Sequence, residues 1–139
     1  MVMDDVQLKK VLIVDDADEI HLLIKLIFKN HTNIKLYQAM NGKEALKLIE
    51  RSKMDLIIMD MYMPEMDGIS TVLKIRETEK KHNSIKTPII TLSAVTTKSE
   101  KQKALDAGSQ IVIEKPFDRT VLMKSVLKLM KSPDHYSTK

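Results

Sequence analysis

Five short apolar segments alternate with segments of helical periodicity, and this alternation restricts the fold more than any other feature. The strand-like segments are 10–16, 33–39, 55–60, 88–94 and 110–116, and the helical ones are 17–30, 41–52, 67–82, 98–108 and 118–130. Such alternation is typical of parallel strands joined by crossover helices. We therefore predict an α/β fold in which a parallel sheet carries helices on both faces.

The helical segments place apolar side chains three or four residues apart, as a helix with one buried face does. The expected buried sets are Ile20, Leu23, Ile24, Ile27 and Phe28; Ala45, Leu48 and Ile49 behind an Asn41 cap; Ile69, Val72, Leu73 and Arg76; and Val121, Val126 and Leu129. Segment 98–108 offers only Ala104, Leu105 and Ala107 to a core before Gly108 stops it. We expect this fourth helix to be the least stable element.

The chain has 139 residues, of which 43% are apolar and 30% charged, which suits one globular domain. No apolar run approaches the ~20 residues of a membrane span, and the first residues lack a signal-peptide core, so we expect a cytoplasmic location. Cysteine is absent, which excludes disulfides, thiolate nucleophiles and cysteine-based zinc sites. His21, His31, His82 and His135 show no metal-ligand spacing, and we expect them to be surface imidazoles.

The net charge of +4 is unevenly distributed. Residues 1–97 contain 14 basic and 14 acidic side chains, whereas residues 98–131 contain eight basic and four acidic ones. These lysines alternate with acids and have no interleaved aromatic residues, which favours a solvated or acid-binding face over nucleic acid.

Polar residues follow four of the five predicted strands at the point where each strand ends. Asp15 and Asp16 end the first, Asp60 the third, Ser93 the fourth and Lys115 the fifth. Singly, each has a structural explanation, as a helix cap or a surface lysine. Because parallel strands end at one edge of a sheet, where ligands bind, we expect these side chains to form one site.

Three neighbouring carboxylates repel one another, and a cation resolves that conflict. Oxygen ligands without Cys or His nearby select Mg²⁺. Asp60 can then act as a nucleophile toward a phosphoryl group. Lys115 can pair with one phosphoryl oxygen, and the Ser93 hydroxyl can donate to another.

The segments VLIVDD, DLIIMDMYMPEMDG, PIITLSA and EKPF resemble the four signature segments of the response-regulator receiver domain, the CheY-like fold, in order across residues 9–131. The resemblance implies a doubly wound, flavodoxin-like (βα)5 sandwich with strand order 2-1-3-4-5. Residues 1–8 are then a short N-terminal extension and residues 132–139 a polar tail.

The same resemblance assigns the site residues. It implies that Asp60 is the phosphoacceptor, that Asp15, Asp16 and the Tyr62 backbone carbonyl join Asp60 in holding Mg²⁺, and that Lys115 contacts the phosphoryl group. Ser93 is the switch hydroxyl, and the bond between Lys115 and the proline after it is expected to be cis.

Two positions depart from what receivers commonly carry. Val112 stands where an aromatic switch residue is usual, so we expect signalling through a backbone shift of the loop after Ser93. Tyr62 puts a large ring two residues after Asp60, which predicts slow autodephosphorylation; a ring lying flat on the surface is the alternative.

The predicted function is a signalling switch, not an enzyme, apart from its own phosphorylation and dephosphorylation. A histidine kinase or histidine phosphotransfer protein would donate to Asp60, and a downstream protein would bind the face of residues 98–131, without nucleic acid or membrane. One alternative is a haloacid-dehalogenase-type phosphohydrolase, whose Asp-x-Asp motif Asp16–Asp18 superficially fits. The others are a receiver fragment of a larger regulator or hybrid kinase, and a degenerate receiver that binds partners without phosphorylation.

Overall fold

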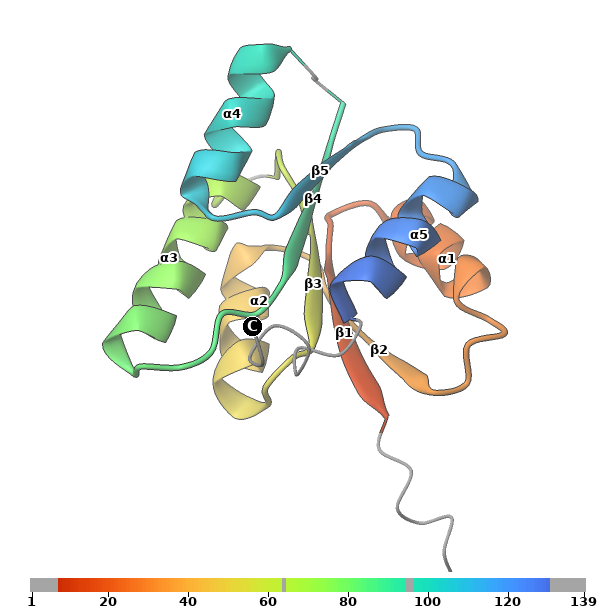
Figure 1. Cartoon of the computed structure of the whole chain (residues 1–139), viewed down its shortest axis with the longest axis horizontal. Coiled ribbons are helices and arrows are strands. Elements are labelled where there is room, and N and C mark those ends of the chain that lie inside the picture. The colour runs from red at the N-terminus through yellow and green to blue at the C-terminus, as the bar shows by residue number, and fades with distance from the viewer. Residues whose placement is uncertain (1–7, 64, 95–96, 131–139) are drawn as a thin grey trace, which may run out of the picture.

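The computed structural model describes residues 8–63, 65–94 and 97–130. The strands are β1 (Lys9–Val14), β2 (Ile34–Ala39), β3 (Leu56–Asp60), β4 (Ile89–Ser93) and β5 (Ile111–Glu114). The helices are α1 (Asp18–Ile27), α2 (Gly42–Arg51), α3 (Gly68–Lys81), α4 (Lys98–Ala107) and α5 (Arg119–Met130). The strands form one parallel sheet in the order β2-β1-β3-β4-β5, which confirms the predicted fold class (Figure 1). The predicted C-terminal tail, and the N-terminal extension except Leu8, lie outside the described residues.

The two faces of the sheet carry separate apolar cores. Successive side chains of a strand point to opposite faces, so Leu56 and Ile58 of β3 pack into one core and Ile57 and Met59 into the other. Helices α1 and α5 cover the first core, and α2, α3 and α4 cover the second (Figure 1). This double burial explains why the central strands read as continuous apolar runs.

Several apolar residues predicted to be buried in helices lie on the surface. Leu23 of α1 is 40% exposed, Leu73 of α3 is 52% exposed and Val121 of α5 is 47% exposed. Their inward positions are taken by neighbours on the same helices, namely His21, Ile75 and Leu122. The 3.6-residue period was predicted correctly, but the angle of each buried stripe depends on where the helix rests on the sheet.

Helix α4 has a small buried surface, as predicted. Ala104 and Ala107 are buried, but Leu105 is 41% exposed and contributes less to the core than expected. Thr97 caps the helix through its side chain, and Gly108 ends it with φ 126°, a backbone conformation that favours glycine. Its low stability remains a prediction.

Among the helices in the described residues, α3 is the longest, with 14 residues. Across the part of the chain that the structure describes, none of the helices combines the length and apolar character needed to traverse a bilayer.

Candidate functional site

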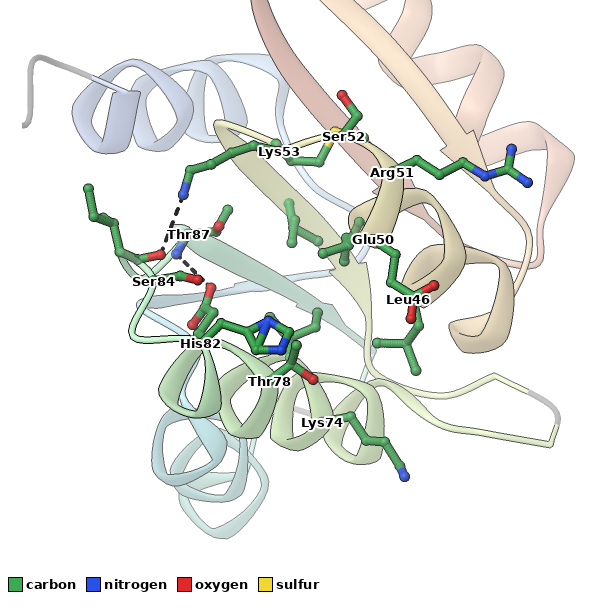
Figure 2. Close-up of a pocket in the computed structure, with 16 residues that line it drawn as sticks. Leu46, Glu50, Arg51, Ser52, Lys53, Lys74, Thr78, His82, Ser84 and Thr87 are labelled. Atoms are coloured by element: carbon green, nitrogen blue, oxygen red, sulfur yellow. Dashed lines mark hydrogen bonds between the residues drawn. The ribbon is translucent and has the colours of Figure 1, made fainter.

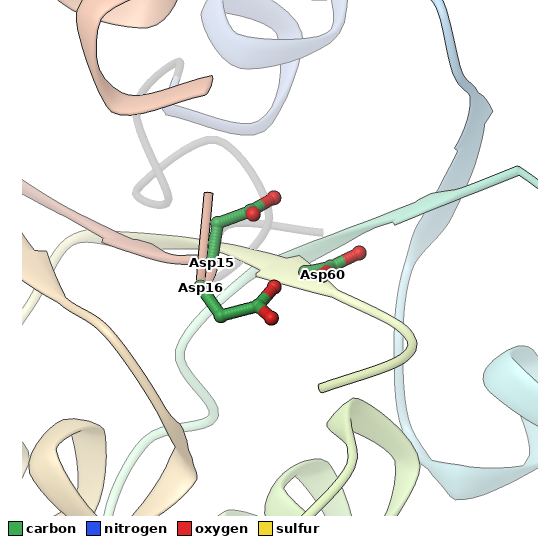
Figure 3. Close-up of side chains that lie close together, drawn as sticks. All are labelled: Asp15, Asp16 and Asp60. Carbon is green, nitrogen blue, oxygen red and sulfur yellow. The ribbon is translucent and has the colours of Figure 1, made fainter. Parts of the chain in front are cut away.

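Three carboxylates meet at the carboxyl edge of the sheet, as the strand ends predicted. Asp15 and Asp16 follow β1, and Asp60 is the last residue of β3, the strand beside it. One oxygen from each lies within 4.8 Å of the others, and Figure 3 shows the three side chains pointing to the same side. Asp15 is fully buried and Asp60 is 6% exposed, whereas Asp16 faces solvent.

Lys115 joins this cluster from the end of β5. Its Nζ lies 2.9 Å from Asp60 Oδ1 and 3.1 Å from Asp15 Oδ2, so one ammonium group bridges two buried carboxylates. The sequence pattern predicted that Lys115 would meet a phosphoryl group, but not that it would pair directly with Asp60. The bond from Lys115 to Pro116 is cis, as the resemblance implied.

The side chains in this cluster shift one another's pKa. Burial raises the pKa of Asp60, and the negative charge of Asp15 raises it further. The hydrogen bond from Lys115 lowers it, but the pKa remains above its usual value. Burial lowers the pKa of Lys115, but the hydrogen bond to Asp60 and the charge of Asp15 outweigh it, so the pKa lies above normal. The ammonium group is therefore charged at neutral pH.

The cluster has the chemistry of a divalent-cation site. Three carboxylates face one ammonium group, so their ionised forms leave a net charge of −2 at this edge. All the side-chain donors are hard oxygens, which suit Mg²⁺. The residues present therefore fit the predicted ion.

The loop after Asp60 is shaped by a close backbone approach. Gly68, the first residue of α3, donates from its N–H to the carbonyl of Met61 at 2.8 Å. A Cβ atom at Gly68 would lie only 2.1 Å from the Asp60 carbonyl oxygen. Asp67 caps α3 by accepting from Ser70 N–H at 2.8 Å. The DG pair therefore lets the chain turn back tightly against the end of β3.

Ser93 ends β4, beside the end of β3, and is 1% exposed. Its carbonyl oxygen accepts from Lys115 N–H at 2.8 Å, which fixes β5 against β4 next to the acidic cluster. The structure thus brings Ser93 to the same edge, as predicted. Val112 is half-buried on β5 opposite Thr91 of β4.

The structure corrects the prediction that every histidine lies on the surface. His21 is 3% exposed, and its Nε2 lies 2.8 Å from the carbonyl oxygen of Asp15. Because a carbonyl only accepts, Nε2 is the protonated nitrogen in this contact. His21 precedes the buried Ile24 and Phe28 by three and seven residues, so the helical period could have placed it inside.

Tyr62 has a partner that the sequence did not suggest. The residue is 51% exposed, and its hydroxyl donates a hydrogen bond to the carboxylate of Glu100 in α4. This hydrogen bond raises the pKa of Tyr62 and lowers the pKa of Glu100. At neutral pH the proton therefore stays on the phenol, and the carboxylate accepts.

A pocket of about 450 Å³ lies at the other end of the sheet, between the C-terminal halves of α2 and α3 (Figure 2). Leu46, Met54 and Ile75 contribute apolar walls, and His82 and Thr87 lie among the polar groups. The candidate site residues are all absent from its lining.

Comparison with known proteins decides the family. The pattern of the response regulator receiver domain matches residues 11–127. The chain belongs to this family. Receiver domains are parts of two-component systems, and this assignment does not favour the interpretation of Asp16 and Asp18 as a haloacid-dehalogenase motif.

Relatives of this receiver domain agree with the assignment. The transcriptional regulatory protein SrrA of Staphylococcus aureus is 32% identical over 122 residues, which are 88% of this chain and 48% of SrrA. The chain thus spans about half the length of the curated relatives that it matches.

Two solved structures share the receiver fold. One is from the co-crystal structure of the Saccharomyces cerevisiae phosphotransfer protein Ypd1 and the receiver domain of Ssk1, with 28% identity, TM-score 0.82 and coverage of 88% and 89%. The other is the receiver domain of the sensor histidine kinase PA1611 from Pseudomonas aeruginosa, with a magnesium ion in its active-site cleft. It has 26% identity, TM-score 0.78 and coverage of 90% and 99%.

Proposed function

We propose that this receiver domain, over residues 9–131, accepts a phosphoryl group on Asp60 and then changes its binding to a partner protein. The observation that carries the proposal is the cluster in which the buried Asp60 lies beside Asp15 and Asp16 and is bonded to Lys115. A buried, ion-paired carboxylate at the binding edge of a parallel sheet is positioned for nucleophilic attack.

The transfer involves Asp60 as the attacking group. A carboxylate oxygen of Asp60 forms a bond to phosphorus while the bond from phosphorus to the donor breaks, and an acyl phosphate results. A phosphohistidine of a histidine kinase or phosphotransfer protein would supply the group, and its imidazole nitrogen would leave. Lys115, already 2.9 Å from Asp60 Oδ1, is placed to pair with the negative charge that arrives.

Asp15, Asp16, Asp60 and the Tyr62 carbonyl would hold Mg²⁺, which supplies charge neutralisation on the transferring oxygens. The magnesium ion in the related PA1611 receiver supports this choice of cation. Ser93 would donate its hydroxyl to a phosphoryl oxygen, as its place at the end of β4 allows. A shift of the loop after Ser93 would then carry the signal, because Val112 has no aromatic ring to relocate.

Two surfaces support binding to proteins. Leu22, Leu23 and Leu26 are 58%, 40% and 53% exposed on α1, the helix that follows the acidic pair, and form an apolar surface where a phosphodonor protein would approach. The basic face of residues 98–131 would bind an acidic surface on a downstream protein. Weakening of that second interaction by salt would support the proposal, and binding that is equally strong at high salt would contradict it.

Intact mass measurement after incubation with acetyl phosphate and Mg²⁺ tests the function. We expect one added phosphoryl group in the wild type and none in Asp60→Asn. Asp16→Asn should retain the modification, because Asp16 is not the nucleophile; loss in Asp16→Asn with retention in Asp60→Asn would restore the phosphohydrolase alternative. An unmodified wild type would favour a receiver that binds partners without phosphorylation.

A further inference from the structure

The side chain of Tyr62 connects two parts of the molecule that are distant in sequence. Tyr62 lies in the loop between β3 and α3, two residues after Asp60, and Glu100 lies 38 residues further on, in the first turn of α4. Since β3 and β4 are neighbours and α4 follows β4, the Tyr62 side chain extends from the end of β3 to the segment beyond β4. The hydrogen bond therefore lies at the same edge of the sheet as the acidic cluster, on the β4 side of Asp60.

Glu100 is itself held in position by its own helix. Its backbone N–H donates to the Thr97 side chain, the N-cap of α4, at 3.2 Å. One carboxylate oxygen accepts from Tyr62, and the other lies 3.2 Å from Lys103 Nζ. These two contacts limit the positions that the Glu100 carboxylate can take, so it offers the Tyr62 phenol an oriented acceptor.

An exposed tyrosine without such a partner changes rotamer within picoseconds to nanoseconds. The hydrogen bond to Glu100 instead selects the rotamer in which the Tyr62 ring lies between the phosphoacceptor loop and α4. In hydrolysis, a water oxygen forms a bond to phosphorus, the bond from phosphorus to the Asp60 oxygen breaks, and inorganic phosphate leaves with the water's protons. We expect a ring that is held two residues after Asp60 to restrict the approach of that water.

We propose that Glu100 is a positioning residue: by bonding to Tyr62 it holds the phenol ring at the phosphoacceptor edge and lengthens the lifetime of the phosphoryl group on Asp60. This inference rests on the proposed function of Asp60. It adds that Glu100, a residue of α4 outside the acidic cluster, influences the lifetime of the phosphorylated state.

The test compares the half-life of the phosphorylated protein, followed by intact mass after removal of acetyl phosphate, in four variants. Glu100→Ala removes the acceptor, and Tyr62→Phe removes the donor but keeps the ring. We expect each to shorten the half-life roughly three- to tenfold, and the double variant to shorten it no further. Glu100→Gln keeps an oxygen acceptor and should retain most of the wild-type half-life.

Asp106→Ala is the matched control, because it removes another α4 carboxylate, one that accepts a hydrogen bond from Gln102 of the same helix. We expect its half-life to equal that of the wild type. Equal half-lives in Glu100→Ala and the wild type, or an equal shortening in Asp106→Ala, would overturn the positioning role while leaving phosphorylation of Asp60 intact. A wild type that takes up no phosphoryl group overturns the proposed function, and this inference with it.

Discussion

The two ends of the sheet differ in where a pocket lies and in where charged side chains are brought together. The amino end has a pocket of about 450 Å³, and Figure 2 shows Arg51 and Lys74 extending outward from it. The carboxyl end instead brings the buried Asp15 and Asp60 together with the half-buried Lys115 in ion pairs. The proposed phosphoryl chemistry therefore uses the end where charges lie close together and partly away from water, since ionic interactions strengthen there.

This difference has a physical origin in the connections of the fold. At the carboxyl end, residues that leave adjacent parallel strands are brought into contact by the register of the sheet. At the amino end, the pocket is bounded by helix ends and by the loop before β4, whose side chains have solvent available to them. Substitutions at the two ends should consequently have unequal effects.

The largest difference is expected for the backbone turn at the carboxyl end. In Gly68→Ala the new methyl group would lie 2.1 Å from the Asp60 carbonyl oxygen, and a backbone atom cannot easily move aside. We expect the free energy of unfolding to fall by about 3 kcal/mol or more. Urea unfolding measures it, with Ile85→Ala as the amino-end control, because Ile85 is 76% exposed and should change stability by less than about 0.5 kcal/mol. Similar losses of unfolding free energy in Gly68→Ala and Ile85→Ala would contradict the expected difference between the two ends of the sheet.

A second comparison uses two lysines. Lys115→Met leaves the buried carboxylates of Asp15 and Asp60 without their common cation, and we expect a loss of about 2–3 kcal/mol in metal-free protein. Lys53→Met, at the amino end, removes a 3.5 Å contact to the Ile85 carbonyl and should cost under about 0.5 kcal/mol. Chemical denaturation of both variants in EDTA provides the measurement. A smaller loss in Lys115→Met than in Lys53→Met would contradict the assignment.

The histidines give a third comparison. His21→Ala leaves the Asp15 carbonyl without its 2.8 Å partner and opens space in a buried position, so we expect a loss of about 2 kcal/mol. His82→Ala changes an exposed side chain beside the amino-end pocket and should stay within about 0.5 kcal/mol of the wild type. Thermal unfolding of the two variants measures the difference. Equal melting temperatures would show that burial of His21 contributes little.

The smallest expected effect is an increase in stability, in the variant Asp60→Asn. Because the pKa of Asp60 is raised, the folded state binds its proton more tightly than the unfolded state does, and stability falls as pH rises above the ordinary value of 3.8. In EDTA at pH 7, Asp60→Asn should therefore be more stable than the wild type by about 1 kcal/mol, with little difference below pH 3.8.

Unfolding measured against pH tests this sign. Adding Mg²⁺ should stabilise the wild type and not Asp60→Asn, since binding to the folded state shifts the equilibrium. Glu50→Gln, an exposed change at the amino end, is the control and should change stability little at either pH. An Asp60→Asn variant less stable than the wild type in EDTA would contradict the raised pKa.

Local patterns predicted the elements well but the orientation of helices less well. The alternation of apolar runs and helical periods gave all five strands and all five helices. The same patterns predicted that Leu23 and Leu73 are buried, but both are exposed. A stripe of apolar residues does not define how the helix is rotated about its axis on the sheet, so neighbouring positions can exchange between the core and the surface. His21 occupies the inward position that Leu23 was expected to fill.

The pattern of apolar and polar residues was enough to predict the fold class and the gathering of Asp15, Asp16, Asp60, Ser93 and Lys115 at one edge. Hydrophobic pattern defines where each strand ends, and a parallel sheet then brings those ends together. The contacts made there depend on the folded arrangement: Lys115 bonds to Asp60 across 55 residues, and Tyr62 bonds to Glu100 across 38. Side-chain partners at such separations depend on how packed elements meet in space, about which local periodicity carries no information.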